Sequence, residues 1–310
     1  FSFLTLNATD WTYPISTGLF MALILVELIQ VSRKKTFKDP FLLPHHLDPS
    51  MDLETAKRVQ EALLSIDPPL TDQIKIVRRC VPATTLGGDF YTFVNKTIKQ
   101  VQSKAKQQGI VELVDSHENL IGVTVGDVAG HGVSSALVMA LASGLLGRIG
   151  QNNRSPAVIL QRANIDIQKF IAQSQISHVT AIYSTINLDE MTLTYAAAGH
   201  PPGVIVRPDL TYDLLESNGI FLGMYPDEVY QEKTVKLASG ERILLFTDGI
   251  IDTMNKDREE FGMQRLIETA LINFDKEPED LVELVFEQLY KYREGHTQRD
   301  DQTLVVVDIN

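Results

Sequence analysis

Short apolar runs bounded by turn residues recur along the chain after Leu70, and this pattern predicts β-strands. The predicted strands are IKIVRRC, DFYTFV, GIVELV, LIGVTVGD, VTAIYSTIN, MTLTYAAA, GVIV, ERILLFTD and QTLVVVDI. Apolar residues at helical spacing predict helices over 51–66, from about Val133, from Ser155-Pro156, near 261–273 and over 278–293. The polar, lysine-rich segment 95–106 predicts a hairpin excursion. Strands in consecutive hairpins around a central helix pair favour antiparallel sheets, so the expected fold is α+β, an antiparallel β-sandwich flanked by helices.

The N-terminal region contains one long apolar run, residues 13–31, which is close to the length that spans a bilayer. Basic residues 33–35 follow it, and the interfacial aromatics Trp11 and Tyr13 stand at its start. This pattern favours a membrane helix whose C-terminal side is cytoplasmic. Glu27 counts against a span, which leaves a buried or amphipathic helix as the alternative. A cleaved signal peptide is less favoured, because no basic residue precedes the run.

We therefore divide the chain into an extracytoplasmic remnant (1–12), a transmembrane helix (13–32), a linker and signalling helix (33–66) and a globular domain (67–310). Three prolines mark 38–50 as a linker, and the 51–66 helix could pack against itself in a homodimer. The chain begins with Phe1, which indicates a fragment or a processed product. The expected location is the cell membrane, with 67–310 in the cytoplasm; without a span at 13–31, the chain would be cytoplasmic.

The net charge of −12 argues against nucleic acid as the main partner, because phosphate backbones are bound by clustered Lys and Arg. The same charge makes a two-metal nuclease remote. Cys80 is the single cysteine, so the chain has no intrachain disulfide. A cysteine phosphatase loop would have Arg six residues later, where Leu86 stands. Cys80 is therefore interpreted as a small buried apolar residue.

Aspartates mark the ends of several predicted strands. Asp89 opens one strand, Asp127 and Asp248 each close one, and Asp300-Asp301 precede the last. In antiparallel sheets these positions fall at the same end, where convergent carboxylates repel unless they bind protons or cations. Oxygen ligands suit Mg²⁺ or Mn²⁺. Each Asp-Gly pair alone is typical of a turn, but the ordered set points to a metal site.

Five motifs stand at these positions: GGDFY (87–91), VGDVAGHG (125–132), AAAGHPP (196–202), FTDGIID (246–252) and RDDQTLVVV (299–307). With them the chain resembles the metal-dependent PPM phosphatases, the protein phosphatase 2C-like family, and most of all the bacterial branch typified by SpoIIE and RsbU. The resemblance covers about residue 54 to the C-terminus. It implies a two-layer β-sandwich with outer helices and a binuclear Mn²⁺ or Mg²⁺ centre, where a water attacks phosphorus without a covalent enzyme intermediate.

The resemblance also assigns roles to individual residues. Asp127 would bridge both ions; Asp89 and the Val128 carbonyl would serve one of them, Asp248 and Asp300 the other. Asp301 is either a supporting acid or a ligand. His131 is either a catalytic residue acting on the leaving group or a local hydrogen-bonding residue, and His200 is expected to be structural. Thr92 stands where many relatives have Asp, and Arg78 and Arg79 are weak candidates for a phosphate-binding arginine.

The implied activity is hydrolysis of phosphoserine or phosphothreonine on a protein. By resemblance the substrate would be an anti-anti-sigma factor with a STAS-type fold, in a partner-switching pathway. The alternative is a catalytically silent phosphatase fold that acts as a signalling scaffold. The intact set of aspartates argues against it, because a scaffold has no need of acidic strand ends.

Overall fold

The structure is a computed structural model that describes residues 49–105, 111–172, 176–216 and 218–310. It divides into two compact units, Phe1–Asp52 and Leu53–Asn310, and the second unit contains both sheets. The predicted remnant (1–12), the predicted membrane helix (13–32) and most of the predicted linker lie outside the described residues.

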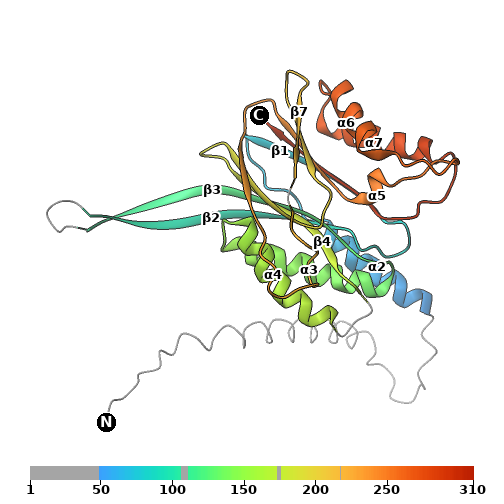
Figure 1. The fold of residues 1–310 in the computed structure, drawn as a ribbon, viewed down its shortest axis with the longest axis horizontal. Helices are drawn as coiled ribbons and strands as arrows, with labels where there is room; N and C mark the ends of the chain where they lie inside the picture. Colours follow the sequence, from blue (N-terminus) through green and yellow to red (C-terminus); the bar gives the residue numbers. More distant parts are fainter. Residues whose placement is uncertain (1–48, 106–110, 173–175, 217) are drawn as a thin grey trace, which may run out of the picture. The chain divides into compact units, whose positions relative to one another are not determined.

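Two five-stranded antiparallel sheets form the centre of the second unit, as predicted (Figure 1). Sheet A has the order β1 (Ile74–Val81), β10 (Gln302–Ile309), β9 (Arg242–Phe246), β6 (Gly203–Val206) and β7 (Tyr212–Leu215). Sheet B has the order β2 (Phe90–Ala105), β3 (Val111–Val128), β4 (Val179–Asn187), β5 (Thr192–Ala198) and β8 (Lys233–Lys236). The predicted hairpin excursion at 95–106 is the outer part of the long β2–β3 hairpin.

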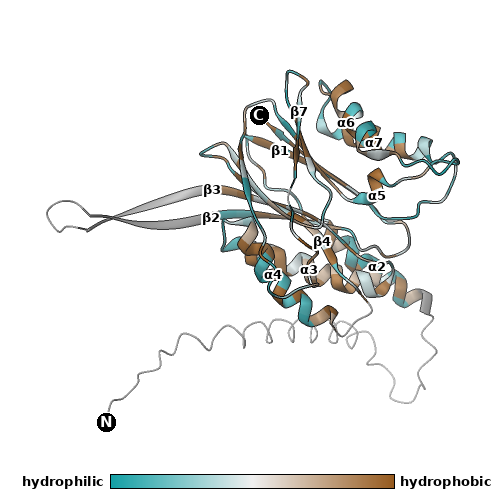
Figure 2. Cartoon of the chain, in the orientation of Figure 1, coloured by the Kyte–Doolittle hydropathy of each residue, from teal (hydrophilic) through white to brown (hydrophobic). Residues whose placement is uncertain are grey.

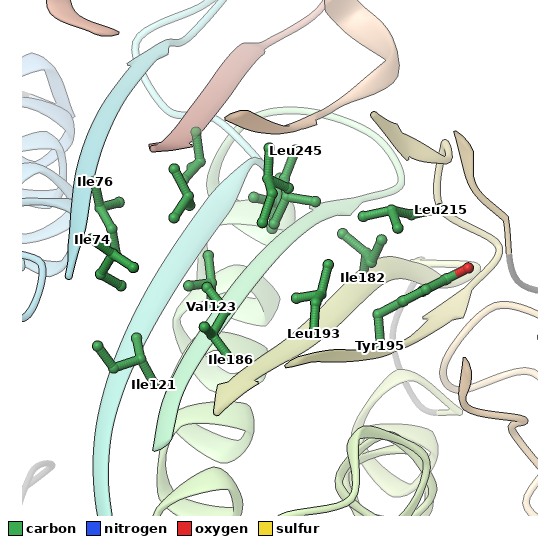
Figure 3. Packing of buried hydrophobic residues seen from close by; sticks show 14 of the residues in the cluster. Ile74, Ile76, Ile121, Val123, Ile182, Ile186, Leu193, Tyr195, Leu215 and Leu245 are labelled. Carbon is green, nitrogen blue, oxygen red and sulfur yellow. The ribbon is translucent and has the colours of Figure 1, made fainter. Parts of the chain in front are cut away.

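The main core lies between the two sheets, where alternate residues of the strands face each other. Along β2, for example, Tyr91 and Phe93 face sheet A, whereas Phe90 points to the outer helices. Figure 3 shows side chains from both sheets gathered in this layer, among them Val123 and Leu245. Because both faces of the central strands are buried, their apolar runs are nearly continuous rather than alternating.

Helix pairs cover the outer faces. α3 (Val133–Gln151) and α4 (Pro156–Ile171) pack on sheet B, and α6 (Gly262–Ile272) and α7 (Pro278–Tyr292) pack on sheet A. Hydrophobic and hydrophilic residues alternate along α4, α6 and α7, as amphipathic surface helices require (Figure 2). The Ser155 side chain caps α4 by accepting a hydrogen bond from the Val158 N–H at 3.2 Å, as expected for a Ser-Pro start.

Several element bounds differ from the predictions. The 51–66 helix is α2 (Pro49–Leu64), so residues 49–50 of the predicted linker are helical. The described part of the predicted strand 109–114, residues 111–114, is continuous with the next predicted strand in β3. The sequence analysis missed β7, β8 and the short helix α5 (Asp248–Ile251).

Within the described residues, one helix, α3, is long and apolar enough to cross a membrane by length and composition. Its residues Val138, Met139, Ala142 and Leu146 are buried in the core cluster that α3 forms with α4 and sheet B. This packing accounts for the apolar residues on the buried face of α3, whereas Val133 and Leu137 are exposed.

Candidate metal centre

The acidic strand ends lie at one end of the sandwich. Asp89 directly precedes β2, Asp127 lies near the end of β3, and Asp300-Asp301 directly precede β10. The prediction for Asp248 needs a correction: β9 ends at Phe246, and Asp248 begins α5. Thr247 is still extended and lies between β9 and α5. The chain turns into the helix at Asp248, which lies near the other carboxylates.

Asp89 forms the buried base of this site, with only 2% of its surface exposed. Its Oδ2 accepts hydrogen bonds from the hydroxyls of Thr247 and Thr303, both at 2.7 Å. Thr303 belongs to β10 of sheet A and Thr247 directly follows β9 of the same sheet, so Asp89 connects the ends of the two sheets. Burial and the charges of Asp127 and Asp301 raise the pKa of Asp89, which means that its ionised form needs a positive neighbour.

Asp301 binds the backbone of the loop that carries Asp89. Its Oδ1 accepts a hydrogen bond from the Ala83 N–H at 2.7 Å, and its Oδ2 accepts one from the Gly88 N–H at 2.6 Å. A Cβ at Gly87 would lie 2.5 Å from Asp301 Oδ2, so only glycine lets the loop close on this carboxylate. Both carboxylate oxygens are therefore engaged in holding the loop.

Asp127 lies half-buried between the sheets' ends. Burial, followed by the charges of Asp248 and Asp300, raises its pKa to about 7. The Val128 carbonyl lies beside it: a Cβ at Gly88 would be 2.6 Å from Val128 O and 3.2 Å from Asp127 Oδ1. The second glycine of the GGDFY motif thus leaves room next to two oxygen atoms that could both bind a cation.

Asp248 and Asp300 lie on the more accessible side of the site. Burial raises the pKa of Asp248, and the charge of Asp252 adds to this effect. Burial also raises the pKa of Asp300, an effect that Asp248 strengthens and His131 opposes. The sequence analysis missed Asp252. The signal was present, because Asp252 ends the FTDGIID motif one helical turn after Asp248.

These acids suit a hard divalent cation. In the described part of the chain, no three Asp, Glu, His or Cys side chains are already gathered closely enough to enclose an ion. Nevertheless, each of Asp89, Asp127, Asp248 and Asp300 has a pKa raised by burial and by its neighbours' charges. Cations relieve such repulsion without protons, and carboxylate and carbonyl oxygens are the ligands of Mg²⁺ and Mn²⁺.

Three histidines, His131, His178 and His200, lie near the acidic residues, and their environments differ. His131 is exposed in a turn between Gly130 (φ 98°) and Gly132 (φ 84°). It is near enough to Asp300 for its charge to lower the pKa of the Asp300 carboxyl. His178, which sequence analysis missed, stacks on the Phe221 ring with a centroid separation of 4.2 Å. Burial lowers the pKa of His178, whereas the charge of Asp248 raises it. His178 therefore lies at the edge of the acidic cluster.

His200 has the structural role expected for it. It is buried, and its Nδ1 is 2.9 Å from the Thr180 hydroxyl. Thr180 is the β4 partner of Asp127 in the strand register. Burial lowers the pKa of His200 to about 3, so its ring is neutral and supports the strand beside Asp127.

The remaining candidates from the sequence point away from the acids. Arg79 forms an ion pair with Glu283 of α7 and lies over the Phe286 ring at 4.5 Å. Arg78 lies over the Tyr91 ring at 5.6 Å. Thr92 is buried towards α3, because a Cβ at Gly147 would be 3.4 Å from its hydroxyl. An Asp at position 92 would therefore face the helix layer.

One connection from α2 reaches the site. Gln60 is 7% exposed, and its Nε2 donates a hydrogen bond to the Gly87 carbonyl at 2.7 Å. The Gly87 N–H donates to Gln60 Oε1 at 3.0 Å. Nearby, the Tyr91 hydroxyl donates to the Leu64 carbonyl at the end of α2. The helix is thus bound directly to the loop that Asp301 holds from the other side.

The family of the chain follows from its similarity to known proteins. Residues 117–310, more than half of the chain, match the model of the family described as stage II sporulation protein E (SpoIIE). The chain belongs to the SpoIIE family. It is 29% identical over 259 residues to the phosphoserine phosphatase RsbU of Bacillus subtilis (strain 168), which covers 83% of this chain and 69% of RsbU.

Two further similarities support the assignment of the chain to the SpoIIE family. It is 25% identical over 265 residues to the phosphoserine phosphatase RsbP of Bacillus subtilis (strain 168), a match that covers 85% of the chain but only 59% of RsbP. The fold is similar to that of the SiaA-PP2C domain of Pseudomonas aeruginosa, with a TM-score of 0.66 and 22% identity over 84% of this chain and 97% of that one. The chain carries a PP2C-type phosphatase domain, and the sandwich predicted from its motifs is confirmed.

Proposed function

We propose that this chain is a metal-dependent phosphoprotein phosphatase whose reaction centre is Asp127. One observation carries the proposal: burial, and then the charges of the neighbouring carboxylates of Asp248 and Asp300, raise the pKa of Asp127 to about 7. A fold gains nothing from such repulsion, whereas divalent cations at the site would relieve it. The names of RsbU and RsbP, both phosphoserine phosphatases, support the same reaction.

The residues divide naturally over two cations, Mn²⁺ or Mg²⁺. Asp127 would contact both, Asp89 and the Val128 carbonyl would face one, and Asp248 and Asp300 would hold the other. Bound cations would supply an acidified water for attack on phosphorus and would neutralise charge on the phosphoryl oxygens.

The protein's own groups set the geometry around them. Thr247 and Thr303 fix the buried oxygen of Asp89, which leaves its other oxygen for the site. Asp301 serves as the supporting acid, because its oxygens already accept hydrogen bonds from the loop backbone. His131, exposed next to Asp300, is placed to orient or protonate a leaving serine oxygen.

The substrate that we infer is a phosphoserine or phosphothreonine on a regulatory protein, an anti-anti-sigma factor of STAS type. The resemblance of the five motifs to the RsbU branch supports this choice. A protein substrate also suits the open position of Asp300 and His131, both exposed at the rim.

The linker helix would transmit a signal to this site. Val59 and Leu63 in the C-terminal half of α2, and Ile66 just after it, are exposed at 45%, 39% and 38%. The spacing of Val59 and Leu63 places them on one helix face, which suits a homodimer of α2 helices. A membrane anchor at 13–31 would hold such a dimer at the cytoplasmic face of the cell membrane. Val59→Ser with Leu63→Ser should shift the molar mass in light scattering from dimer to monomer, whereas a dimer that persists would contradict this interface.

The activity is tested with the full chain and para-nitrophenyl phosphate or a phosphoserine peptide, with Mn²⁺ and with EDTA. We expect metal-dependent turnover that Asp127→Asn abolishes. Asp166→Asn on α4, where Asp166 forms an exposed pair with Lys169 at 2.9 Å, is the matched control and should retain full activity. Turnover that is absent under all metal conditions would favour the scaffold instead.

A further inference from the structure

A cavity of about 290 Å³ opens beside Asp300, on the side of the site that faces the turn after α5 and the loop after α7. Basic residues outnumber acidic residues in its lining. It contains the acids Asp252 and Asp300 and the basic residues Lys256, Arg258, Arg293, His296 and Arg299. Ligand cavities of this size are at the small end of the usual range, so it admits one or two side chains rather than a large cofactor.

The arginines of this cavity have no acidic partners among the described residues. The Arg258 side chain makes no hydrogen bond or ion pair within that part of the chain, and Arg299 donates only to the Met254 sulfur, at 3.3 Å. The buried Nε of Arg293 has no hydrogen-bond partner, and its guanidinium lies 5.8 Å from the Tyr290 ring.

Several arginines elsewhere in the chain are paired with acids. Arg242 binds Asp308 with contacts of 2.6 Å, and Arg207 binds both Asp213 and Glu241. In a chain with a net charge of −12, acids are plentiful. Guanidinium groups that remain without them around one cavity are therefore available to an anion from another molecule.

The loop that carries Arg258 is fixed by its own hydrogen bonds. The side-chain oxygen of Asn255 accepts from the N–H groups of Asp257 and Glu259, both at 2.9 Å. Arg258 between them has φ 64°, a left-handed conformation that non-glycine residues adopt rarely. The turn thus presents Arg258 at the cavity without any need for a ligand to order it.

We propose that this cavity binds an acidic side chain of the substrate protein, close to the phosphoserine that is hydrolysed. The inference rests on the proposed function, because Asp300 belongs both to the cavity wall and to the proposed metal centre. Asp300 no longer repels an anion when it holds a cation, and the remaining lining is then mainly basic. A carboxylate fits the guanidinium fork through two parallel hydrogen bonds, which gives specificity for Asp or Glu over a neutral residue.

The experiment compares three substrates of the Mn²⁺-loaded full chain: a phosphoserine peptide with Asp and Glu beside the phosphoserine, the same peptide with Asn and Gln, and para-nitrophenyl phosphate. The variants are Arg258→Gln and Arg293→Lys. The lysine in Arg293→Lys keeps the positive charge but lacks the forked guanidinium group. The matched control is Arg162→Gln, an exposed arginine on α4.

We expect wild type to prefer the acidic peptide, and Arg258→Gln to lose about tenfold or more in kcat/KM for it, mainly through KM, as expected for loss of a hydrogen bond between charged groups. The neutral peptide and para-nitrophenyl phosphate should be turned over as before, and Arg293→Lys should show a smaller loss confined to the acidic peptide. Equal loss on all three substrates, or none on the acidic peptide, would overturn the inference.

Two further outcomes distinguish failure of the proposed function from failure of the proposed subsite. If wild type hydrolyses none of the three substrates, the proposed function fails, whereas turnover of all three without any preference overturns this subsite alone. Inorganic phosphate is the probe for a second phosphate group. Inhibition by phosphate that weakens in Arg258→Gln would assign the cavity to phosphate and overturn its assignment to an acidic side chain.

Discussion

The substitution Gln60→Met tests whether α2 is energetically connected to the metal centre. Methionine has nearly the same length and shape as glutamine but makes neither of the two hydrogen bonds to Gly87. The Gly87 N–H and carbonyl would then be buried without partners, because Gln60 itself is only 7% exposed. Each unpaired group costs about 1–3 kcal/mol, and the apolar thioether recovers part of that sum. We expect a net loss of about 2–4 kcal/mol in the free energy that holds α2 on the domain.

Because α2 lies at the edge of the domain, this loss should appear as undocking of the helix before global unfolding. Hydrogen exchange and limited proteolysis would then show faster exchange and new cleavage within 53–64. The Mn²⁺-dependent turnover should fall as well, since Gly87 precedes Gly88 and Asp89 in the loop that Asp301 holds.

The control is Gln73→Met, which removes a single side-chain hydrogen bond, to the Leu188 carbonyl at 3.0 Å, outside the acidic motifs. It should cost about 1 kcal/mol and leave turnover unchanged. If Gln60→Met matches this control in exchange, proteolysis and turnover, the contact is a passive surface contact and the reasoning is wrong.

Three other substitutions test the packing and the charges of the domain. Asp301→Asn offers one acceptor oxygen in place of two, so it should lower stability in urea and EDTA by about 1–3 kcal/mol, less any relief of repulsion; a variant that loses only Mn²⁺ affinity would identify Asp301 as a ligand. Burial lowers the pKa of Lys96 to about 7, below its unfolded value of 10.5, so the wild-type free energy of unfolding should rise with pH between these values. Lys96→Met should flatten that rise, by up to several kcal/mol, in urea titrations at pH 7 and pH 9; parallel profiles would contradict a buried, neutralised Lys96. Gly150→Ala should cost about 1–3 kcal/mol in thermal or urea unfolding, because the new Cβ would lie 2.1 Å from the Tyr183 hydroxyl, whereas Gly144→Ala on the same helix meets nothing within 4 Å and should be neutral or stabilising. Equal effects of the two alanines would refute the packing argument.

Much of the fold could be predicted because local patterns determine it. The apolar runs in β4, β9 and β10 are buried along nearly their whole length, so their period and turn residues were enough to place them. β7 and β8 were missed because each has four residues, most of them exposed, and such short edge strands carry little apolar signal. α5 was missed for a similar reason, since four residues at the end of a strand show no helical period.

The site was predictable only where its residues stand at strand ends. The antiparallel topology brings Asp89, Asp127 and Asp300 to one end of the sandwich, and the order of motifs reveals this. Gln60 could not be found, because its partner is 27 residues away and a helical pattern does not show which polar side chain reaches another element. Lys96 belongs to a polar segment expected to be a hairpin excursion, yet it is 1% exposed and donates to the Asn153 carbonyl at 3.0 Å.

The hydrogen bonds made by the acids of the site separate the acid that holds the loop from those that could bind a cation. Asp301, at 5% exposed, has its oxygens occupied by backbone N–H groups, and it can therefore contribute to stability without any metal. Asp127 and Asp248 are half-buried and Asp300 is exposed. The raised pKa of each of these three shows that their charges are compensated incompletely within the protein. A carboxylate whose oxygens already accept hydrogen bonds has few lone pairs left for a cation. A carboxylate whose negative charge is not compensated is stabilised when a cation binds. Metal binding should therefore draw its free energy from the acids whose charges remain uncompensated, Asp89 among them, on a loop that Asp301 has already fixed.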